Sequence, residues 1–404
     1  MASVLAAAGA FNATYILRWG GSRTLVGLLS SLPALIAVFL FMPAARILER
    51  QRRYGPFVVW SLFGSRIGYL LLALMPMVMR RWVPEATAFT LIAMSAPAVL
   101  FATGWNPLLA DVVPENVRAT VFSWRSILSS GTIALLTYGA GLWLDRSAFP
   151  GNYQWLYAVG LAGGLLSVYL VARIQIPDTE PAQIPLLHRK VSLLEGVRQG
   201  LGERPQFGRL TINTLVFNLG AWMLGPLYII FFVQELGAAD SWVGLYTTVI
   251  HVAIMAGYWA WRRISIRMGD FPSLLVALPI VTAFPFLVTL LPNLSMILVI
   301  GLLIHLFVPG VDLNHSLIFM ARVPPSRRHT SIAFYSVVMN LGAFVCPIAG
   351  VALAGVIGIR WTLVVGGLLR ALGVILFYRY PMDDRRPDLV ALGGALRDLL
   401  PRRR

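Results

Sequence analysis

The sequence predicts an all-α integral membrane protein with twelve transmembrane helices in two parallel six-helix repeats, and three observations lead to this fold class. Of the 404 residues, 58% are hydrophobic and 12% are charged, whereas soluble proteins carry about 25% charged residues. Twelve apolar runs are long enough, or nearly long enough, to cross a bilayer. A short sequence pattern recurs at one offset in the two halves. Twelve spans of about 20 residues occupy roughly 240 residues, which excludes a large water-soluble domain.

Apolar runs separated by arginine, proline and glycine clusters define the predicted helices. Their ranges are 2–17, 24–45, 56–79, 86–109, 119–143, 153–175, 207–233, 241–262, 271–291, 294–320, 330–357 and 361–379. At about 1.5 Å per residue the first reaches roughly 24 Å, against a hydrocarbon core of about 30 Å. Helix 1 is therefore expected to be truncated or to start upstream of the first residue. It lacks the basic leader of a signal peptide, and Asn12, Thr14 and Tyr15 are typical of a helix that lines a pore.

The positions of the basic residues predict the orientation of the chain. With the even-numbered connections inside, 24 arginines and lysines lie inside, six outside and three within spans. Both termini are therefore predicted to be cytoplasmic, and the arginine-rich composition favours the inner membrane of a prokaryotic cell. The net charge of +16 then reflects topology and contact with anionic lipids rather than nucleic-acid binding.

Two segments of the second half repeat segments of the first. The octapeptide TLVGLLSS at 24–31 aligns with SWVGLYTT at 241–248, an offset of 217, and the same offset places 46–50 on 263–267. Six spans per half is an even number, so both halves enter the membrane in the same orientation and the repeats are parallel.

The repeat divides the chain into four predicted parts. They are an N-terminal six-helix bundle at 1–175, a cytoplasmic linker at 176–206, a C-terminal six-helix bundle at 207–380 and a basic cytoplasmic tail at 381–404. The linker is rich in proline and partly amphipathic, and the tail alternates apolar and charged residues. Both are expected to lie on the anionic inner surface of the membrane.

Two related loop sequences follow helices 2 and 8. The first, ARILERQRR at 45–53, contains the acid Glu49 before Arg50, and the second, RRISIRMGD at 262–270, has Ile266 before Arg267. Both resemble, in degraded form, the Gly-x-x-x-Asp-Arg-x-Gly-Arg-Arg signature of the major facilitator superfamily (MFS) of transporters. The resemblance covers nearly the whole chain and implies the MFS fold. The glycine-rich signature of the drug exporters of this family is absent from helix 5.

The resemblance also implies a cytoplasmic gate, in which an acid meets a helix N-terminus and an arginine when the pore is open outward. The residues at the matching positions are Glu49, Arg50, Arg118, Arg125 and Arg267.

A charged side chain at the bilayer centre costs about 3 kcal/mol and needs a partner or a cavity. Asp312 on helix 10 lies ten residues before Arg322, so it is predicted near mid-membrane. On a continuous helix, His305 and His315 fall within an arc of roughly 80° around it, although Pro309 next to a glycine favours a break. We expect Asp312 with His315 to bind a proton or to hold substrate, with His305 as a further candidate for the same pathway; the alternative is a buried structural bridge.

Other candidates follow from the resemblance, which implies that helices 1, 4, 7 and 10 line the cavity. The polar and aromatic residues on helices 1, 4 and 7 are Asn12, Tyr15, Trp105, Asn106, Asn218 and Trp222. Their alternative role is helix packing and interhelical hydrogen bonding. Arg66 and Arg370 lie on helices that the family places outside the cavity-lining set. The sequence identifies no interhelical partner for either arginine.

The predicted function is secondary active transport of a small organic solute by rocker-switch alternating access, coupled to protons, in a monomer. The only lysine, Lys190, does not lie in a Walker A loop, and the chain has a single cysteine and no metalloprotease or nucleophile-elbow motif. No enzyme activity, cofactor or metal site is therefore expected. A cavity with one carboxylate, amides and aromatics slightly favours a neutral or cationic solute over a dianion. The alternative is a non-transporting membrane assembly factor, or a subunit energised by a separate ATPase.

Overall fold

A computed structural model describes residues 2–50, 54–79, 81–112, 115–174, 205–322 and 328–382. Nearly all of these residues are helical, and these ranges contain no strand. Ten helical segments within them are long and apolar enough to cross a membrane. The predicted linker at 176–206 and the predicted tail at 381–404 lie almost entirely outside the described residues.

The chain forms two compact units. The first comprises Met1–His188 together with Phe232–Thr248, and the second comprises Arg189–Phe231 together with Val249–Arg404. The turn between the first two helices of the second repeat therefore belongs to the first unit.

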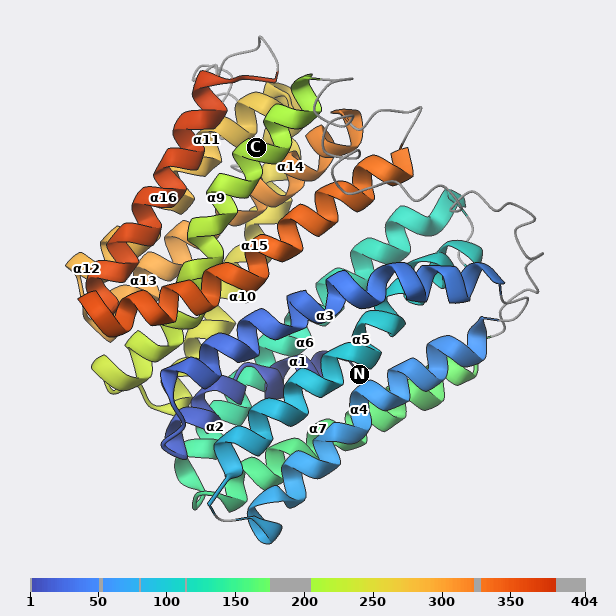
Figure 1. Cartoon of the computed structure of the whole chain (residues 1–404), viewed down its shortest axis with the longest axis vertical. Coiled ribbons are helices and arrows are strands. Elements are labelled where there is room, and N and C mark those ends of the chain that lie inside the picture. Colours follow the sequence, from blue (N-terminus) through green and yellow to red (C-terminus); the bar gives the residue numbers. More distant parts are fainter. Residues whose placement is uncertain are drawn as a thin grey trace, which may run out of the picture. The chain divides into compact units, whose positions relative to one another are not determined.

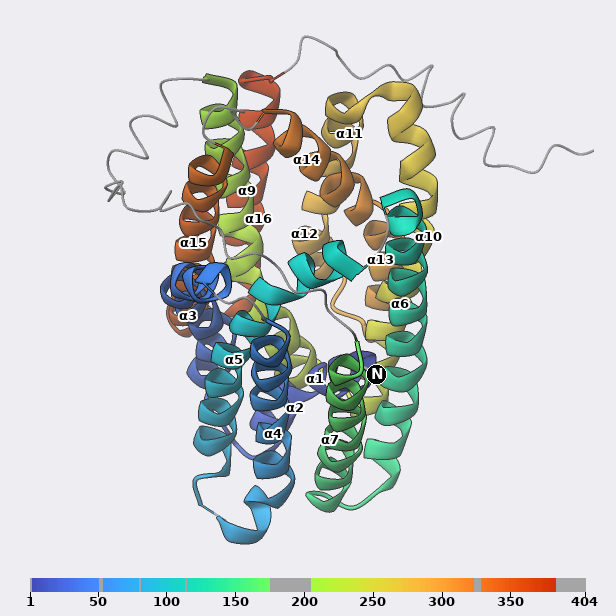
Figure 2. The ribbon, with the colours of Figure 1, turned by 90° about the vertical axis from the view of Figure 1, so that its right-hand side faces the viewer.

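The helices of the first unit follow the predicted spans (Figure 1). They are α1 (Ala2–Gly9), α2 (Asn12–Arg18), α3 (Arg23–Arg50), α4 (Gly55–Val78), α5 (Val83–Val112), α6 (Glu115–Arg146) and α7 (Gly151–Ala172). The predicted first helix is two short helices, α1 and α2, which are interrupted after Gly9. Within the unit, α4 packs between α5 and α7, while α1 packs against α6 and α7 (Figure 2).

The remaining helices begin with α9 (Pro205–Ile230), which continues as the π-helical turn η1 (Phe231–Glu235). They continue with α10 (Asp240–Met268), α11 (Asp270–Thr282), α12 (Phe284–Leu290), α13 (Leu294–His305), α14 (Val308–Arg322), α15 (Arg328–Ile357) and α16 (Ile359–Arg379). The predicted ninth and tenth spans are each two helices. Proline lacks the N–H that an unbroken helix needs, and Pro285 and Pro309 lie in the first turn after each interruption.

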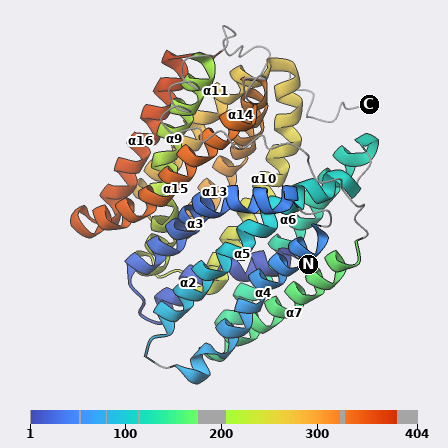
Figure 3. The ribbon, with the colours of Figure 1, turned by 45° about the vertical axis from the view of Figure 1, so that its right-hand side comes forward.

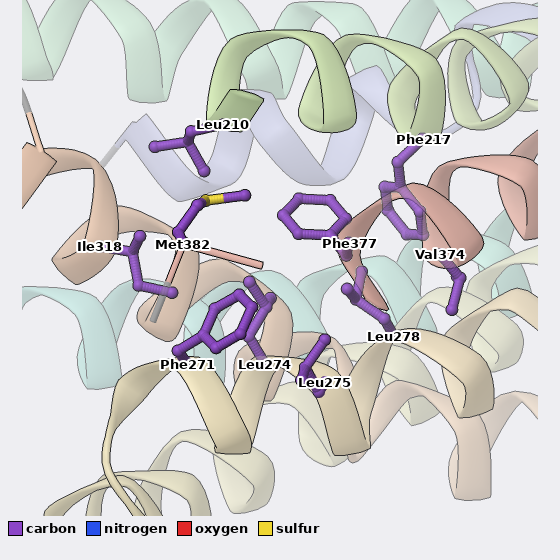
Figure 4. Packing of buried hydrophobic residues seen from close by; sticks show 10 residues of the cluster. All are labelled: Leu210, Phe217, Phe271, Leu274, Leu275, Leu278, Ile318, Val374, Phe377 and Met382. Carbon is purple, nitrogen blue, oxygen red and sulfur yellow. The ribbon is translucent and has the colours of Figure 1, made fainter. Parts of the chain in front are cut away.

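In the second unit, α9 packs between α15 and α16, and α11 packs against α14 and α16 (Figures 1 and 3). One apolar cluster joins α9, α11, α14 and α16, and Figure 4 shows its side chains meeting between these helices. Its residues are Leu210, Phe217, Phe271, Leu274, Leu275, Leu278, Ile318, Val374, Phe377 and Met382. The second unit therefore has its own core.

Glycines let α9 and α16 approach each other closely. A Cβ atom at Gly220 would overlap the carbonyl oxygen of Gly366 and the side chain of Arg370, and one at Gly373 would overlap the backbone of Phe217. Small residues at such contacts are typical of helices packed in a membrane, where van der Waals contact rather than the hydrophobic effect drives association.

We expect Gly220→Leu to lower the free energy of unfolding by about 3 kcal/mol, because the new side chain meets backbone that cannot move aside. Thermal unfolding of the purified protein in detergent measures the loss. The matched control is Gly225→Leu on the same helix, where a Cβ meets nothing within 4 Å. Equal effects of the two substitutions would contradict the account of this helix contact.

Candidate functional site

A polar cluster surrounds His315 on α14. Its Nε2 lies 3.0 Å from the hydroxyl of Thr214 on α9 and 3.3 Å from the hydroxyl of Tyr335 on α15. The ring of Phe319 stacks parallel to the imidazole, and its centroid is 4.5 Å from that of Tyr335. We call Thr214, His315, Phe319 and Tyr335 the His315 cluster. It joins three helices of the second unit through one imidazole nitrogen.

Asp312 lies three residues before His315 but does not pair with it. The side chain of Asp312 is exposed, and among the described residues it takes part in no ion pair. Among the residues that the structure describes, Tyr258 on α10 interacts with it electrostatically. At the predicted mid-membrane depth, an exposed carboxylate would be costly against lipid unless water or a polar solute lay beside it.

The tenth span is interrupted between His305 and Val308, immediately before Pro309 and Gly310. The carbonyl of Leu306 that the interruption frees accepts a hydrogen bond of 3.0 Å from the indole Nε1 of Trp261. It therefore faces α10 and not a cavity.

The interruption separates His305 from the other two ionisable residues of this span. Its Nδ1 lies 2.8 Å from the carbonyl oxygen of Gly301, and its ring meets Phe284 edge-on at 5.3 Å. The common face calculated for a continuous helix is not formed, because His305, Asp312 and His315 have different neighbours.

Arg370 on α16 is buried in the second unit, with 9% of its surface exposed. Its guanidinium lies over the ring of Phe217, 4.6 Å from the centroid, and within electrostatic range of Tyr228 and His305. Its Nε has no hydrogen-bond partner among the described residues. A cation–π contact contributes up to about 2 kcal/mol when desolvated, less than the cost of about 3 kcal/mol or more for a cation at mid-membrane. The contact with Phe217 alone does not stabilise this charge.

Arg66 on α4 has a different setting. Its aliphatic stem packs where a Cβ on Gly164 would lie, beside Leu5 of α1, and Tyr69 is its electrostatic neighbour. Its stem therefore fills the space between α1, α4 and α7.

The remaining candidates for the substrate pathway lie in packed positions. Tyr15 is fully buried among aromatic rings, 4.7 Å from the ring centroid of Tyr153, and Asn12 accepts a hydrogen bond of 3.3 Å from the hydroxyl of Tyr157. Trp105 packs with Phe101 against the core of the first unit. These contacts are those of packing residues in this conformation.

On α9, Trp222 lies where a Cβ on Gly342 of α15 would be, which places it in a helix contact, whereas Asn218 is half-buried. The side chain of Asn106 lies outside what the structure describes.

The predicted cytoplasmic gate is described only in part. The side chains of Glu49, Arg50 and Arg118 lie outside the described residues, whereas Arg125 on α6 and Arg267 on α10 are exposed. This gate stays a prediction.

The first unit holds a charged cluster that the sequence reading missed. Nε of Arg18, at the end of α2, lies 2.9 Å from Oδ2 of Asp240, at the start of α10, and the side chain of Asp240 is 3% exposed. Nε of Arg23 donates a hydrogen bond of 2.7 Å to Oε1 of Gln234. The two carboxylate oxygens of Asp145, at the end of α6, each accept a bond of 3.0 Å from the backbone N–H groups of Asp240 and Ser241. We call Arg18, Arg23, Asp145, Gln234 and Asp240 the Arg18–Asp240 cluster.

The physical chemistry of this cluster is favourable at each contact. Asp145 occupies the positive end of the α10 dipole and satisfies two N–H groups that no helix residue can bond. Burial alone would lower the pKa of Arg18, but the carboxylate of Asp240 raises that pKa above its ordinary value. Arg18 is therefore a cation at any physiological pH.

The repeat relates two residues of this cluster to each other. The offset of 217 places Arg23, at the start of α3, on Asp240, at the start of α10. Equivalent turns of the two repeats thus carry opposite charges at the same position. Two features of the sequence indicate this cluster. One is the charge reversal between the repeats, and the other is that Arg18 and Arg23 are two of the six arginines predicted on the outer side.

Comparison with known proteins was made on sequence and on structure. Residues 210–403 match the sequence model of the Major Facilitator Superfamily. This match covers slightly less than half of the chain. No curated protein matches the chain at a significant level. The match and the ten apolar helical segments support a multi-pass integral membrane protein.

Solved structures of transporters share this MFS fold at low identity. A bacterial homologue of the human lysosomal transporter Spinster is 14% identical, with a TM-score of 0.62, over 98% of this chain and 97% of that one. A bacterial homologue of the iron transporter ferroportin is 13% identical, with a TM-score of 0.70, over 94% and 95%. The nucleoside transporter NupG is 12% identical, with a TM-score of 0.70, over 94% and 98%. Proteins named for such different solutes share the fold, so the fold does not determine the substrate.

Proposed function

We propose that this protein is a member of the Major Facilitator Superfamily and a secondary active transporter that moves a small organic solute by rocker-switch alternating access. The bundles at 1–175 and 207–380 rock about a site near the midplane of the membrane, and protons drive the cycle. The observation that carries the proposal is the Arg18–Asp240 cluster. The cluster joins the ends of α2, α3 and α6, in the first repeat, to the connection between α9 and α10, in the second repeat. It does so through one ion pair, one side-chain hydrogen bond and the two bonds that Asp145 accepts. Contacts of this kind form and break without unfolding a helix, as a reversible gate requires.

Proton coupling is assigned to Asp312 and the His315 cluster. The hydroxyls of Thr214 and Tyr335, which lie on different helices, are both within hydrogen-bond distance of Nε2 of His315, and the unprotonated nitrogen accepts a hydrogen bond from one of them. Once protonated, the same nitrogen donates and no longer accepts from either hydroxyl. Uptake of one proton therefore changes the bonds that hold α14 to α9 and α15. Asp312, exposed one turn away, supplies the second titratable group of the pathway.

The direct test is transport in sealed proteoliposomes with an imposed pH gradient and no ATP. Candidate solutes come from a thermal-stability screen of the purified protein against a metabolite library. Gradient-driven uptake supports the proposal. Movement that requires added ATP and a second protein would favour a subunit energised by an ATPase, and absence of transport for every solute that binds would favour an assembly factor.

We expect Asp312→Asn to reduce gradient-driven transport at least tenfold and to flatten its pH profile, because the variant loses a titratable carboxylate. The measurement is the initial rate of uptake between pH 5 and 8. The matched control is Ser316→Ala, one turn further along α14, whose hydroxyl bonds only the backbone carbonyl of Asp312. A wild-type rate and pH profile in Asp312→Asn would remove Asp312 from the pathway.

We also propose that the protein is a monomer in the inner membrane of a prokaryotic cell, with both termini cytoplasmic. The arginine distribution supports this orientation, and the basic segments at 176–206 and 381–404 are assigned to the anionic inner leaflet. The Arg18–Asp240 cluster then lies on the outer side, because its residues belong to connections assigned outside.

A further inference from the structure

Arg370 and three further polar residues of the second unit interact in a chain, and none of the four is acidic. Arg370 interacts electrostatically with Tyr228 on α9 and with His305 on α13, and His305 interacts in turn with His251 on α10. The ring of Phe284 packs beside two of these groups: its centroid lies 5.1 Å from that of Tyr228 and 5.3 Å from that of His305. We call Arg370, His305, Tyr228 and His251 the Arg370 cluster.

The cluster has a permanent positive charge and no described acid to balance it. The guanidinium of Arg370 is charged at every physiological pH. Arg370 is more than nine-tenths buried, and no described residue forms a hydrogen bond with its Nε. The neighbours that interact electrostatically with Arg370 among the described residues, Tyr228 and His305, are not acids. Contacts with Phe217 and the backbone of Gly220 hold the stem of Arg370 in place.

The hydrogen bonding of His305 determines what its other nitrogen can do. The carbonyl oxygen of Gly301 can only accept, so the proton between them belongs to Nδ1 of His305. Nε2 therefore has no proton in the neutral ring and becomes a donor only when the imidazole takes up a second proton. The ionisable groups that face this ring are Arg370 and His251. A negative charge placed among them favours the protonated ring.

We propose that the Arg370 cluster binds an oxyanion, the carboxylate or phosphate group of a small solute, together with one proton. The planar guanidinium of Arg370 matches the two oxygens of such a group, protonated Nε2 of His305 donates to it, and the hydroxyl of Tyr228 is a further donor. This inference names a substrate class for the proposed transporter. Anion binding itself does not depend on the proposed function; only the step that takes the bound anion as the transported solute rests on it. The inference also replaces the preference for a neutral or cationic solute, which considered Asp312 but gave Arg370 no role.

The competing explanation is purely structural. In it, the partial negative charge at the C-terminal end of α13 and the rings of Phe217 and Phe284 stabilise Arg370, and no anion enters. The two explanations differ in whether added anion stabilises the protein and whether binding takes up a proton.

The experiment measures binding of acetate and of inorganic phosphate to the purified full-length protein in detergent. Thermal unfolding at increasing anion concentration gives an apparent affinity, with chloride at equal ionic strength as the reference. Proton uptake is measured in weakly buffered solution when each anion is added. The variants are Arg370→Gln, Arg370→Lys and His305→Gln, and the matched control is Arg379→Gln, an exposed arginine on the same helix.

We expect acetate or phosphate to stabilise the wild type and Arg379→Gln more than chloride does, with uptake of about one proton per bound anion. The affinity falls by about tenfold or more in Arg370→Gln and is partly kept in Arg370→Lys, since a charged hydrogen bond is lost in the first and a cation remains in the second. His305→Gln binds with no proton uptake. A response to acetate alone or to phosphate alone identifies which oxyanion the cluster accepts.

The proposal is overturned if neither anion stabilises the wild type beyond chloride, or if Arg370→Gln folds and responds as the wild type does. If Arg370→Gln fails to fold, the test rests on His305→Gln. Proton uptake in His305→Gln equal to that of the wild type would then overturn the proposal. Failure of anion binding together with gradient-driven uptake of some other solute in vesicles would leave the proposed transport function standing. Anion binding without any transport would support the anion site and contradict the proposed transport function.

Discussion

Arg18→Asp is expected to destabilise the Arg18–Asp240 cluster by about 2 kcal/mol or more. The substitution places a second carboxylate beside that of Asp240, whose side chain is 3% exposed. Breaking a fully buried pair costs about 3–5 kcal/mol and an exposed pair contributes about 0–1 kcal/mol. Arg18 is 36% exposed, so its pair lies between these limits. The measurement is the unfolding temperature in detergent, compared with Arg81→Asp, which makes the same charge change at an exposed residue.

The reversed pair provides the stricter test of this interaction. In the double variant Arg18→Asp, Asp240→Arg an attraction of the same geometry is restored, so at least half of the lost stability should return. If the loss of stability in the double variant equals the sum of the losses in the two single variants, the two residues act independently.

Gly141→Leu is expected to reduce transport by more than tenfold while the protein stays folded. Gly141 on α6 lies against the backbone of Asp240 and Ser241, and a Cβ there would overlap the carbonyl oxygen of Asp240. A leucine therefore separates α6 from the first turn of α10, and Asp145 no longer reaches the two N–H groups that it bonds.

The control for this variant lies two residues away on the same helix. Gly139 is exposed and a Cβ there meets nothing within 4 Å, so Gly139→Leu should transport at the wild-type rate. Transport is measured as uptake into proteoliposomes and folding by size-exclusion chromatography. Undiminished transport in Gly141→Leu would show that closure of these helix ends is not part of the cycle.

The fold followed from the sequence because hydropathy and arginine distribution act on every residue of a span. Each predicted span corresponds to a helix or to a pair of consecutive helices. The interruptions were less predictable. Pro309 indicated a break in the tenth span, but the hydrogen bond from Trp261 to the freed carbonyl of Leu306 depends on how α10 packs. The interruption of the first span after Gly9 could not be predicted in this way, because no proline lies near it.

The candidate sites were harder to predict because they depend on partners distant in the sequence. Helical periodicity grouped His305 with Asp312 and His315, but the break at Leu306 gave the first and last of these residues separate partners. Thr214 and Tyr335 are ordinary residues of apolar helices until α9 and α15 bring them to His315. Arg18 and Asp240 could have been found by reading charge through the repeat offset.

The most direct test of alternating access is the distance between spin labels at the ends of helices joined by the Arg18–Asp240 cluster. Labels at Ser22→Cys and Ala239→Cys, both exposed positions, are introduced with Cys346→Ser to remove the native thiol. Pulsed electron paramagnetic resonance in lipid nanodiscs should give two distances, with the longer one gaining population in the Arg18→Asp background. A single distance that Arg18→Asp leaves unchanged would contradict the account.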